Sequence, residues 1–344
     1  MKIHINKLTL KNIVILLVYF ILMWILFGWT KDTPDYFNYA NRFYSGTMSF
    51  GEHGFSLLIN IIKKFGVTDF QEFLKVLSFI YLFCLFGIVK KYSFECNYPL
   101  ALFLVYPFIP FCSGLRFAIA FLFIIIAILI YLGNMKFKKV FFISVIIIAS
   151  SFHYSALFFL ILLISETSIK LKQQVIITIT MCSILAALTY TSFYYNILFL
   201  IASDSNKVMN NVLVHARFGF ILPVIFQIIS FFIFTFAYNH SRSVHNRLLI
   251  NPRLLYKLNI CGLYIIPLYF ITSLFIRLYY PFLFINTLFY SEILFLLKFN
   301  NIKQKLKLLN FGQYMYLFIT NVLIKEHVWL PFFTSNEFIT PLLR

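Results

Sequence analysis

The sequence predicts an all-α polytopic membrane protein with about eleven transmembrane segments. Hydrophobic residues make up 61% of its 344 residues and charged residues only 12%, whereas about a quarter of the residues of a soluble domain are charged. Apolar runs long enough to cross a bilayer recur along the whole chain. The runs are unbroken, whereas the strands of a membrane β-barrel alternate apolar and polar residues. We therefore predict one integral membrane domain over residues 1–344.

The charges and motifs exclude several functional classes. The net charge is +18, but the basic residues occur singly and in pairs between apolar runs, so they form no face for nucleic acid. The five cysteines show no CxxC pairing, which argues against a zinc site or a disulfide framework. No nucleotide-binding signature and no HExxH motif occurs. We expect no metal and no nucleotide cofactor.

The apolar runs define the spans. In chain order we predict them at Leu10–Trp29, Phe73–Val89, Tyr98–Phe111, Leu115–Leu132, Val140–Ile164, Val175–Ile201, Phe218–Tyr238, Leu258–Ile276, Tyr279–Leu297 and Leu308–Leu323.

The basic residues set the orientation. Lys2, Lys7 and Lys11 precede the first run, which is long and lacks a small-residue cleavage site, so we interpret it as a retained span with a cytoplasmic N-terminus. With this orientation, 18 of the 29 Lys and Arg residues lie on the cytoplasmic side. The opposite orientation would reverse the positive-inside bias, and we reject it.

Polar connections on the outer side follow from this orientation. Residues 30–54 form the most polar and aromatic stretch of the first half, and we expect an outer loop there. Residues 55–64 are too short to span and end in two lysines, which favours an interfacial helix. Residues 202–217 form a second outer loop.

The run Val140–Ile164 cannot be a single span. Lysines flank it at both ends, and a polar SSFHYS segment interrupts its middle. If both ends are cytoplasmic, the run must be a hairpin of two short helices or a broken helix, with His153 at its tip near the outer side. Irregular backbone at that depth requires protein or water around it.

Isolated arginines stand at the outer ends of three spans, namely Arg116, Arg217 and Arg277. A guanidinium cannot be left bare in hydrocarbon, so each arginine lies at the membrane surface or faces a wet cavity. The planar guanidinium group can donate two parallel hydrogen bonds to phosphate oxygens. Three arginines around one cavity would therefore hold a pyrophosphate. The alternative is that Arg116 and Arg277 simply extend to lipid headgroups.

Three further residues are candidates for acid–base chemistry. His153 would act as a base or as a further phosphate ligand, with a hydrogen-bonded core histidine as the alternative. Asp35 and Glu52, in the outer segment, are alternative bases. Asp35 would otherwise only cap a helix or fix a loop.

At these residues the chain resembles the Wzy-type polysaccharide polymerases, specifically the EpsG-like branch. Short motifs in the same order carry the resemblance, most clearly over residues 30–160. They are D-Y-x-x-Y (Asp35, Tyr36, Tyr39), E-x-G-F (Glu52, Gly54, Phe55), G-L-R-F-A-I-A around Arg116, F-H-Y-S-A-L around His153, and R-L-Y-Y-P-F from Arg277.

The resemblance implies a glycosyltransferase of O-antigen, capsule or exopolysaccharide biosynthesis, in the bacterial inner (plasma) membrane. Members of this family join oligosaccharide repeat units carried by undecaprenyl pyrophosphate at the outer face, without metal or nucleotide. The implied partners are that lipid-linked oligosaccharide, membrane lipid and a chain-length regulator protein. Arg116, Arg217 and Arg277 would bind the pyrophosphates.

Two other classes remain open at this point. One is a flippase or transporter of lipid-linked sugars, although the related halves that transporters often show are not detectable here. The other is a different lipid-dependent enzyme, such as a glycan ligase or a sugar acyltransferase. A ligase would also use outer arginines and a histidine, and only its product would distinguish it.

Overall fold

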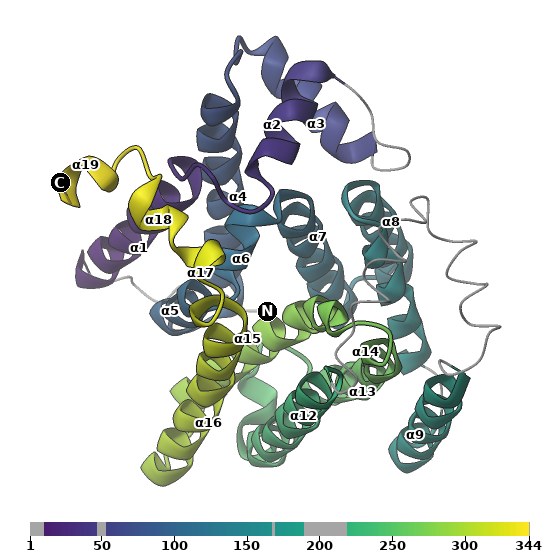
Figure 1. Cartoon of the computed structure of the whole chain (residues 1–344). Helices are drawn as coiled ribbons and strands as arrows, with labels where there is room; N and C mark the ends of the chain where they lie inside the picture. Colours follow the sequence, from purple (N-terminus) through teal and green to yellow (C-terminus); the bar gives the residue numbers. More distant parts are fainter. Residues whose placement is uncertain (1–9, 47–52, 167–168, 189–218, 344) are drawn as a thin grey trace.

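The computed structural model describes residues 10–46, 53–166, 169–188 and 219–343. Apart from one isolated β-bridge, the regular structure of these residues is entirely helical (Figure 1). The helices are α1 (Leu10–Gly28), α2 (Tyr36–Ser45), α3 (His53–Lys64), α4 (Phe70–Tyr92), α5 (Asn97–Val105), α6 (Phe108–Ser113), α7 (Leu115–Leu132), α8 (Lys138–Phe152), η1 (Tyr154–Glu166), α9 (Leu171–Leu188), α12 (Ile221–Ser241), η2 (Arg242–Arg247), α13 (Pro252–Gly262), η3 (Leu263–Ile265), α14 (Ile266–Tyr269), η4 (Ser273–Tyr279), α15 (Tyr280–Leu296), α16 (Asn300–Phe318), η5 (Ile319–Leu323), α17 (Glu326–Trp329), α18 (Pro331–Thr334) and α19 (Thr340–Leu343).

Four helices in the described ranges are long and apolar enough to cross a membrane. They are α4, α7, α9 and the stretch Ile221–Val244 that begins with α12. Shorter apolar helices occupy Asn12–Gly28 and Tyr154–Glu166. The fold is therefore an all-α membrane protein, and the count of about eleven segments and the cytoplasmic N-terminus stay predictions.

The central helices are α7 and α15, because both are buried almost all round. In α7, 78% of the residues lie inside the protein, and in α15 every residue from Tyr280 to Leu294 is buried. A helix that is apolar on all faces belongs in the core of a bundle. By contrast, only 11% of α9 is buried, and α9 lies at the edge of the bundle, at the lower right of Figure 1.

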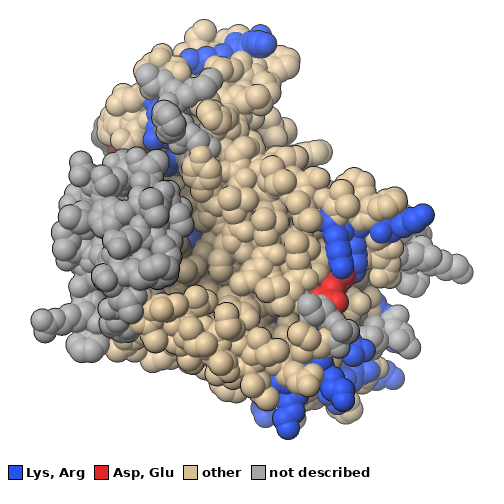
Figure 2. All heavy atoms as spheres, turned by 90° about the vertical axis from the view of Figure 1, so that its right-hand side faces the viewer, with Lys and Arg blue, Asp and Glu red and all other residues tan. Residues whose placement is uncertain are grey.

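The surface agrees with a position in lipid. On the face in Figure 2, Lys and Arg side chains gather at the margins and leave a broad area without charged groups between them. Large apolar side chains on α1, α4 and α12 are exposed, among them Val18, Phe83 and Phe232, each more than half accessible. In a soluble protein such surfaces would need a partner, whereas here the acyl chains of a bilayer can cover them.

Residues 138–166 form the hairpin that the sequence predicts. Helices α8 and η1 pack against each other and meet at His153. At their far ends Glu166 pairs with Lys138 and also with Lys139, whose Nζ lies 3.0 Å from Glu166 Oε2. Both ends of this segment therefore lie on one side of the bundle, and His153 lies at the tip.

Two predicted spans are broken into shorter helices. The run Tyr98–Phe111 divides into α5 and α6 around Tyr106 and Pro107. The run Leu258–Ile276 divides into the end of α13, then η3, α14 and the start of η4. Pro107 lies at the first break, and Pro267 is the second residue of α14. Proline lacks the backbone N–H group that a continuous helix would need at these positions.

The segment predicted as an outer loop contains helical structure. Residues 30–54 contain helix α2, and α3 covers the stretch predicted as an interfacial helix. Helices α2 and α3 lie together beyond one end of the bundle, at the top of Figure 1. The predicted outer loop 202–217 lies outside the described residues.

The C-terminal segment is fastened to the start of the chain. Asn336 is fully buried, and its Nδ2 donates to Thr30 Oγ1 at 2.8 Å and to the carbonyl of Ile25 at 3.1 Å. Glu337 forms ion pairs with Lys31 at 2.7 Å and Lys75 at 3.2 Å. We call these contacts the C-terminal clasp. The clasp joins the two ends of the described chain.

Candidate functional site

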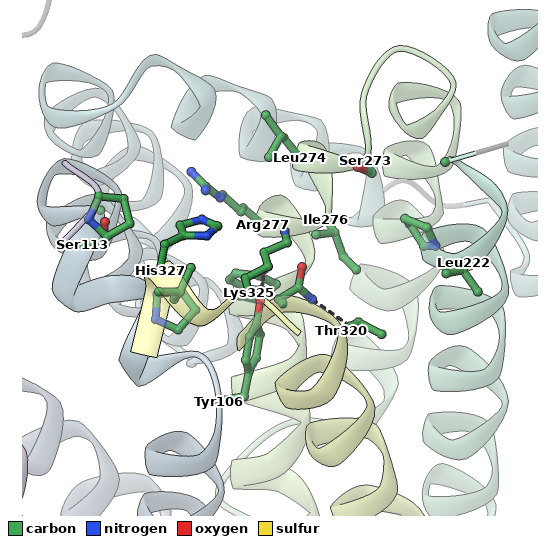
Figure 3. A pocket seen from close by; sticks show the side chains of 18 of the residues that line it. Tyr106, Ser113, Leu222, Ser273, Leu274, Ile276, Arg277, Thr320, Lys325 and His327 are labelled. Carbon is green, nitrogen blue, oxygen red and sulfur yellow. Dashed lines mark hydrogen bonds between the residues drawn. The ribbon is translucent and has the colours of Figure 1, made fainter. Parts of the chain in front are cut away.

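A cavity of about 340 Å³ opens where the N-terminal loop, α6, η4 and the C-terminal segment meet (Figure 3). We call this end of the bundle the cavity end. Tyr106 and Tyr280 are buried beneath the cavity, and their hydroxyl groups are hydrogen-bonded to each other. The lining residues are Pro34, Asp35, Tyr106, Pro110, Ser113, Gly114, Gly219, Leu222, Pro223, Ser273, Leu274, Ile276, Arg277, Tyr280, Tyr316, Thr320, Asn321, Lys325, His327 and Val328.

Arg277 faces this cavity from η4. The helix begins after Thr272, whose hydroxyl oxygen accepts a hydrogen bond from the N–H of Leu274 at 3.2 Å. Arg277 occupies the last turn and is exposed to the cavity. Within the described part of the chain no ion pair joins it to a carboxylate. An exposed guanidinium without an acidic partner, facing a cavity, is suited to an external anion.

Arg116 lies beside the cavity and is not among its lining residues. It occupies the first turn of α7, where its Nε donates to the hydroxyl group of Tyr39 at 3.4 Å. Its guanidinium carbon also lies 5.7 Å from the centre of the Tyr39 ring. Partial burial and the charge of Arg116 lower the pKa of Arg42 on α2, which places the two arginines near each other.

His153 links the two predicted arginines electrostatically. It lies at the junction of α8 and η1, outside both helices, and its Nδ1 is hydrogen-bonded to Ser155 Oγ at 2.7 Å. The positive charges of Arg116 and Arg277 both act on this half-buried imidazole. Of these three residues, only Arg277 lines the cavity.

Asp35 lines the cavity, and its side chain does not cap helix α2. It is the residue before α2, but its carboxylate makes no capping hydrogen bond to the helix. A carboxylate at a helix start ordinarily accepts from the free N–H groups there. Because Asp35 is not used in this way, it is available to a ligand in the cavity.

Two predicted site residues, Glu52 and Arg217, lie outside the described residues. Three basic residues were missed by the sequence analysis: Arg42, Lys325 and His327. Helical spacing would have found Arg42, because it follows Tyr39 by three positions and so shares a face of α2 with it. No local pattern marks Lys325 and His327, which reach the cavity only because the C-terminal segment folds back.

The described residues of the five motifs of the family resemblance converge at the cavity end. The ring of Tyr39 lies 5.4 Å from that of Phe55, and Tyr39 also contacts Arg116. The ring of Phe117 lies 5.4 Å from that of His153 and 6.3 Å from that of Tyr280. Segments far apart in the chain are thus neighbours in the fold.

Gly54 is where α3 meets the tip of the hairpin. A Cβ atom at this position would lie 2.3 Å from Ser151 Oγ and 3.0 Å from the backbone carbonyl carbon and oxygen of Ser151. The hydroxyl group can rotate away, but the backbone cannot. Only glycine therefore allows α3 to lie this close to the residues next to His153.

We expect Gly54→Ala to destabilise the protein by roughly 1–3 kcal/mol, the usual cost of an overpacked contact. The midpoint of thermal unfolding of the purified protein in detergent measures this. Gly87→Ala on α4 is the matched control, because nothing lies within 4 Å of the added methyl group there. A Gly54→Ala protein that unfolds at the wild-type temperature would contradict the close approach.

The described residues include no group of three or more His, Cys, Asp or Glu that could hold a metal ion. The cavity instead combines a guanidinium, an ammonium group, an imidazole and one carboxylate. This is a helical membrane protein with a basic cavity at one end of its bundle.

The chain belongs to the EpsG family, whose model matches residues 13–334. The match covers the helical bundle and most of the C-terminal segment. No curated protein and no solved structure matches the chain.

Proposed function

We propose that this protein is a polysaccharide polymerase of the Wzy type. It joins oligosaccharide repeat units carried on undecaprenyl pyrophosphate, in O-antigen, capsule or exopolysaccharide biosynthesis. Membership of the EpsG family supports this class of activity. The observation that carries the proposal is the cavity in which Arg277, without a carboxylate partner in the described part of the chain, and Asp35, free of a capping role, share one lining.

The reaction needs an anion site and a proton acceptor. The hydroxyl group of the acceptor sugar attacks the anomeric carbon of the donor glycan. The bond between that carbon and the pyrophosphate oxygen breaks, and the pyrophosphate leaves with the bonding electrons. Arg277 is placed to stabilise the negative charge that develops on the leaving oxygen. The proton of the attacking hydroxyl group passes to a base on the protein.

Asp35 is the base in this proposal, because it is the carboxylate residue that lines the cavity among the described residues. His153, which lies close to the arginines but does not line the cavity, is the further phosphate ligand in this proposal. If the Ser155 hydroxyl group donates to Nδ1, the Nε2 nitrogen carries the proton and can donate to a phosphate oxygen. Arg116 holds its place against Tyr39 and adds positive charge beside the cavity. Arg217 and Glu52 retain their predicted roles as a phosphate ligand and an alternative base.

The proposed setting follows from the charge distribution. The distribution of basic residues supports a cytoplasmic N-terminus, with the cavity end at the outer face of the bacterial inner membrane. The reaction uses neither metal nor nucleotide. A chain-length regulator protein is the expected partner within the membrane.

Gel analysis of surface glycan from a deletion strain tests the function. We expect a single repeat unit in place of the long ladder, and restoration of the ladder by the wild-type gene. Accumulation of lipid-linked units on the cytoplasmic leaflet would indicate a flippase instead. A normal ladder that is no longer attached to its final acceptor would indicate a ligase. Loss of acyl groups from the glycan, with no other change, would indicate an acyltransferase.

A further inference from the structure

The C-terminal segment builds one wall of the cavity. Helix α16 continues into a π-helical turn, η5, and then into α17. This segment contributes Thr320, Asn321, Lys325, His327 and Val328 to the lining. A π-helical turn alters the direction of the side chains that follow it, and such turns occur often at functional sites.

Several contacts hold this wall in place. The side-chain amide of Asn321 donates to Thr320 Oγ1 at 3.1 Å and to the carbonyl of Leu317 at 3.2 Å. The indole N–H of Trp329 donates to the carbonyl of Leu323 at 3.2 Å. Beyond α17 the C-terminal clasp ties Asn336 to Thr30. The wall is therefore an ordered part of the fold.

The side chains of Lys325 and His327 lie around the same space as that of Arg277 (Figure 3). Lys325 and His327 are exposed, and in the described ranges no ion pair joins either of them to a carboxylate. Glu326 lies between them in the sequence but is not among the lining residues. The cavity lining thus combines two cations and an imidazole, contributed by η4 and by the C-terminal segment, with one carboxylate, Asp35.

We propose that Lys325 and His327, together with Arg277, form a binding site that selects a lipid diphosphate over a lipid monophosphate. Arg277 binds one phosphate group through two parallel hydrogen bonds, and Lys325 compensates the charge of the other. His327 donates one further hydrogen bond. A lipid monophosphate has no second phosphate group whose charge Lys325 could compensate. The proposal rests on the proposed function, because it specifies the substrate group that the same cavity takes.

Binding of two short lipid probes tests the proposal. The full-length protein is purified into nanodiscs of uncharged lipid, and its Kd is measured for farnesyl diphosphate and for farnesyl monophosphate. We expect the wild type to bind the diphosphate at least ~10-fold more tightly. We expect Lys325→Met to weaken diphosphate binding roughly 10- to 100-fold and to leave monophosphate binding nearly unchanged.

Further variants separate binding from folding. Lys325→Arg keeps the charge, and we expect near wild-type selectivity. His327→Ala is expected to weaken diphosphate binding about 5- to 10-fold, whereas His327→Gln, which keeps a donor, is expected to preserve most of it. The control is Lys305→Met, because Lys305 is exposed on α16 and does not line the cavity. It is expected to bind both probes like the wild type.

The outcomes distinguish this proposal from the function on which it rests. A wild type that selects the diphosphate, with Lys325→Met and His327→Ala equally selective, would overturn the role of the C-terminal wall and leave the polymerase intact. A wild type that binds neither probe would overturn both.

Discussion

Arg277→Met is expected to abolish long glycan chains while single lipid-linked repeat units remain in the membrane. The substitution keeps much of the aliphatic length of the side chain but removes the guanidinium from the cavity. Loss of one group that stabilises the developing charge typically slows such a reaction roughly 100- to 1000-fold. The measurement is a glycan gel from the complemented deletion strain, together with the elongation rate of the purified protein on synthetic lipid-linked units.

The control for this experiment is Arg253→Met. Arg253 is exposed on α13 and does not line the cavity, so its loss removes one positive charge without affecting the site. We expect wild-type ladders from this variant. Protein levels in the membrane are compared by immunoblot. Long ladders from Arg277→Met at normal protein level would refute the role assigned to Arg277.

Asp35→Asn is expected to slow elongation at saturating substrate roughly 100- to 10,000-fold, the range that a general base contributes. The amide is nearly the same size as the carboxylate, but it does not accept a proton from the acceptor hydroxyl group. Because Asp35 makes no capping hydrogen bond to α2, we expect the substitution to leave stability unchanged. The rate constant kcat is measured alongside KM, which is expected to change little.

Asp32→Asn is the matched control for Asp35→Asn. Asp32 is exposed, does not line the cavity and has a φ of 56°, a conformation that asparagine tolerates well.

His153→Gln tests whether His153 is the base instead of Asp35, because glutamine keeps a hydrogen-bond donor but cannot act as a base. An active Asp35→Asn protein beside an inactive His153→Gln protein would transfer the role of base to His153.

Hydropathy located several elements well. The run Leu115–Leu132 coincides with α7, because a long apolar stretch between polar residues has one low-energy state in a bilayer. The hairpin at residues 138–166 followed from lysines at both ends of one apolar run, and the pairing of Glu166 with Lys138 agrees with it. In both cases the decisive signal was local in the sequence.

The breaks inside spans were not predicted. Residues 258–276 contain no charged residue, so their average hydropathy resembles that of a continuous span. The proline at position 267 was the local sign of a break. Whether such a proline bends or divides a helix depends on what its neighbours offer to the freed backbone groups.

Among the site residues, the sequence identified the kinds of group and not their arrangement. Arg277 and Asp35 share the cavity lining, whereas Arg116 lies beside it against Tyr39. Lys325 and His327 were missed, because the clasp that returns the C-terminal segment joins Asn336 to Thr30, 306 positions earlier.

The amino-acid sequence by itself determined that this chain is a helical membrane protein and where most of its apolar segments lie. It also indicated which ends of these apolar segments carry arginines. Both conclusions could be drawn from the sequence because the free-energy cost of placing a residue in lipid depends on that residue and its near neighbours. Only the tertiary structure decided which ionisable groups share one cavity. That choice depends on contacts between distant segments, such as Gly54 with Ser151 and Asn336 with Thr30, and such contacts leave no periodic trace in the sequence.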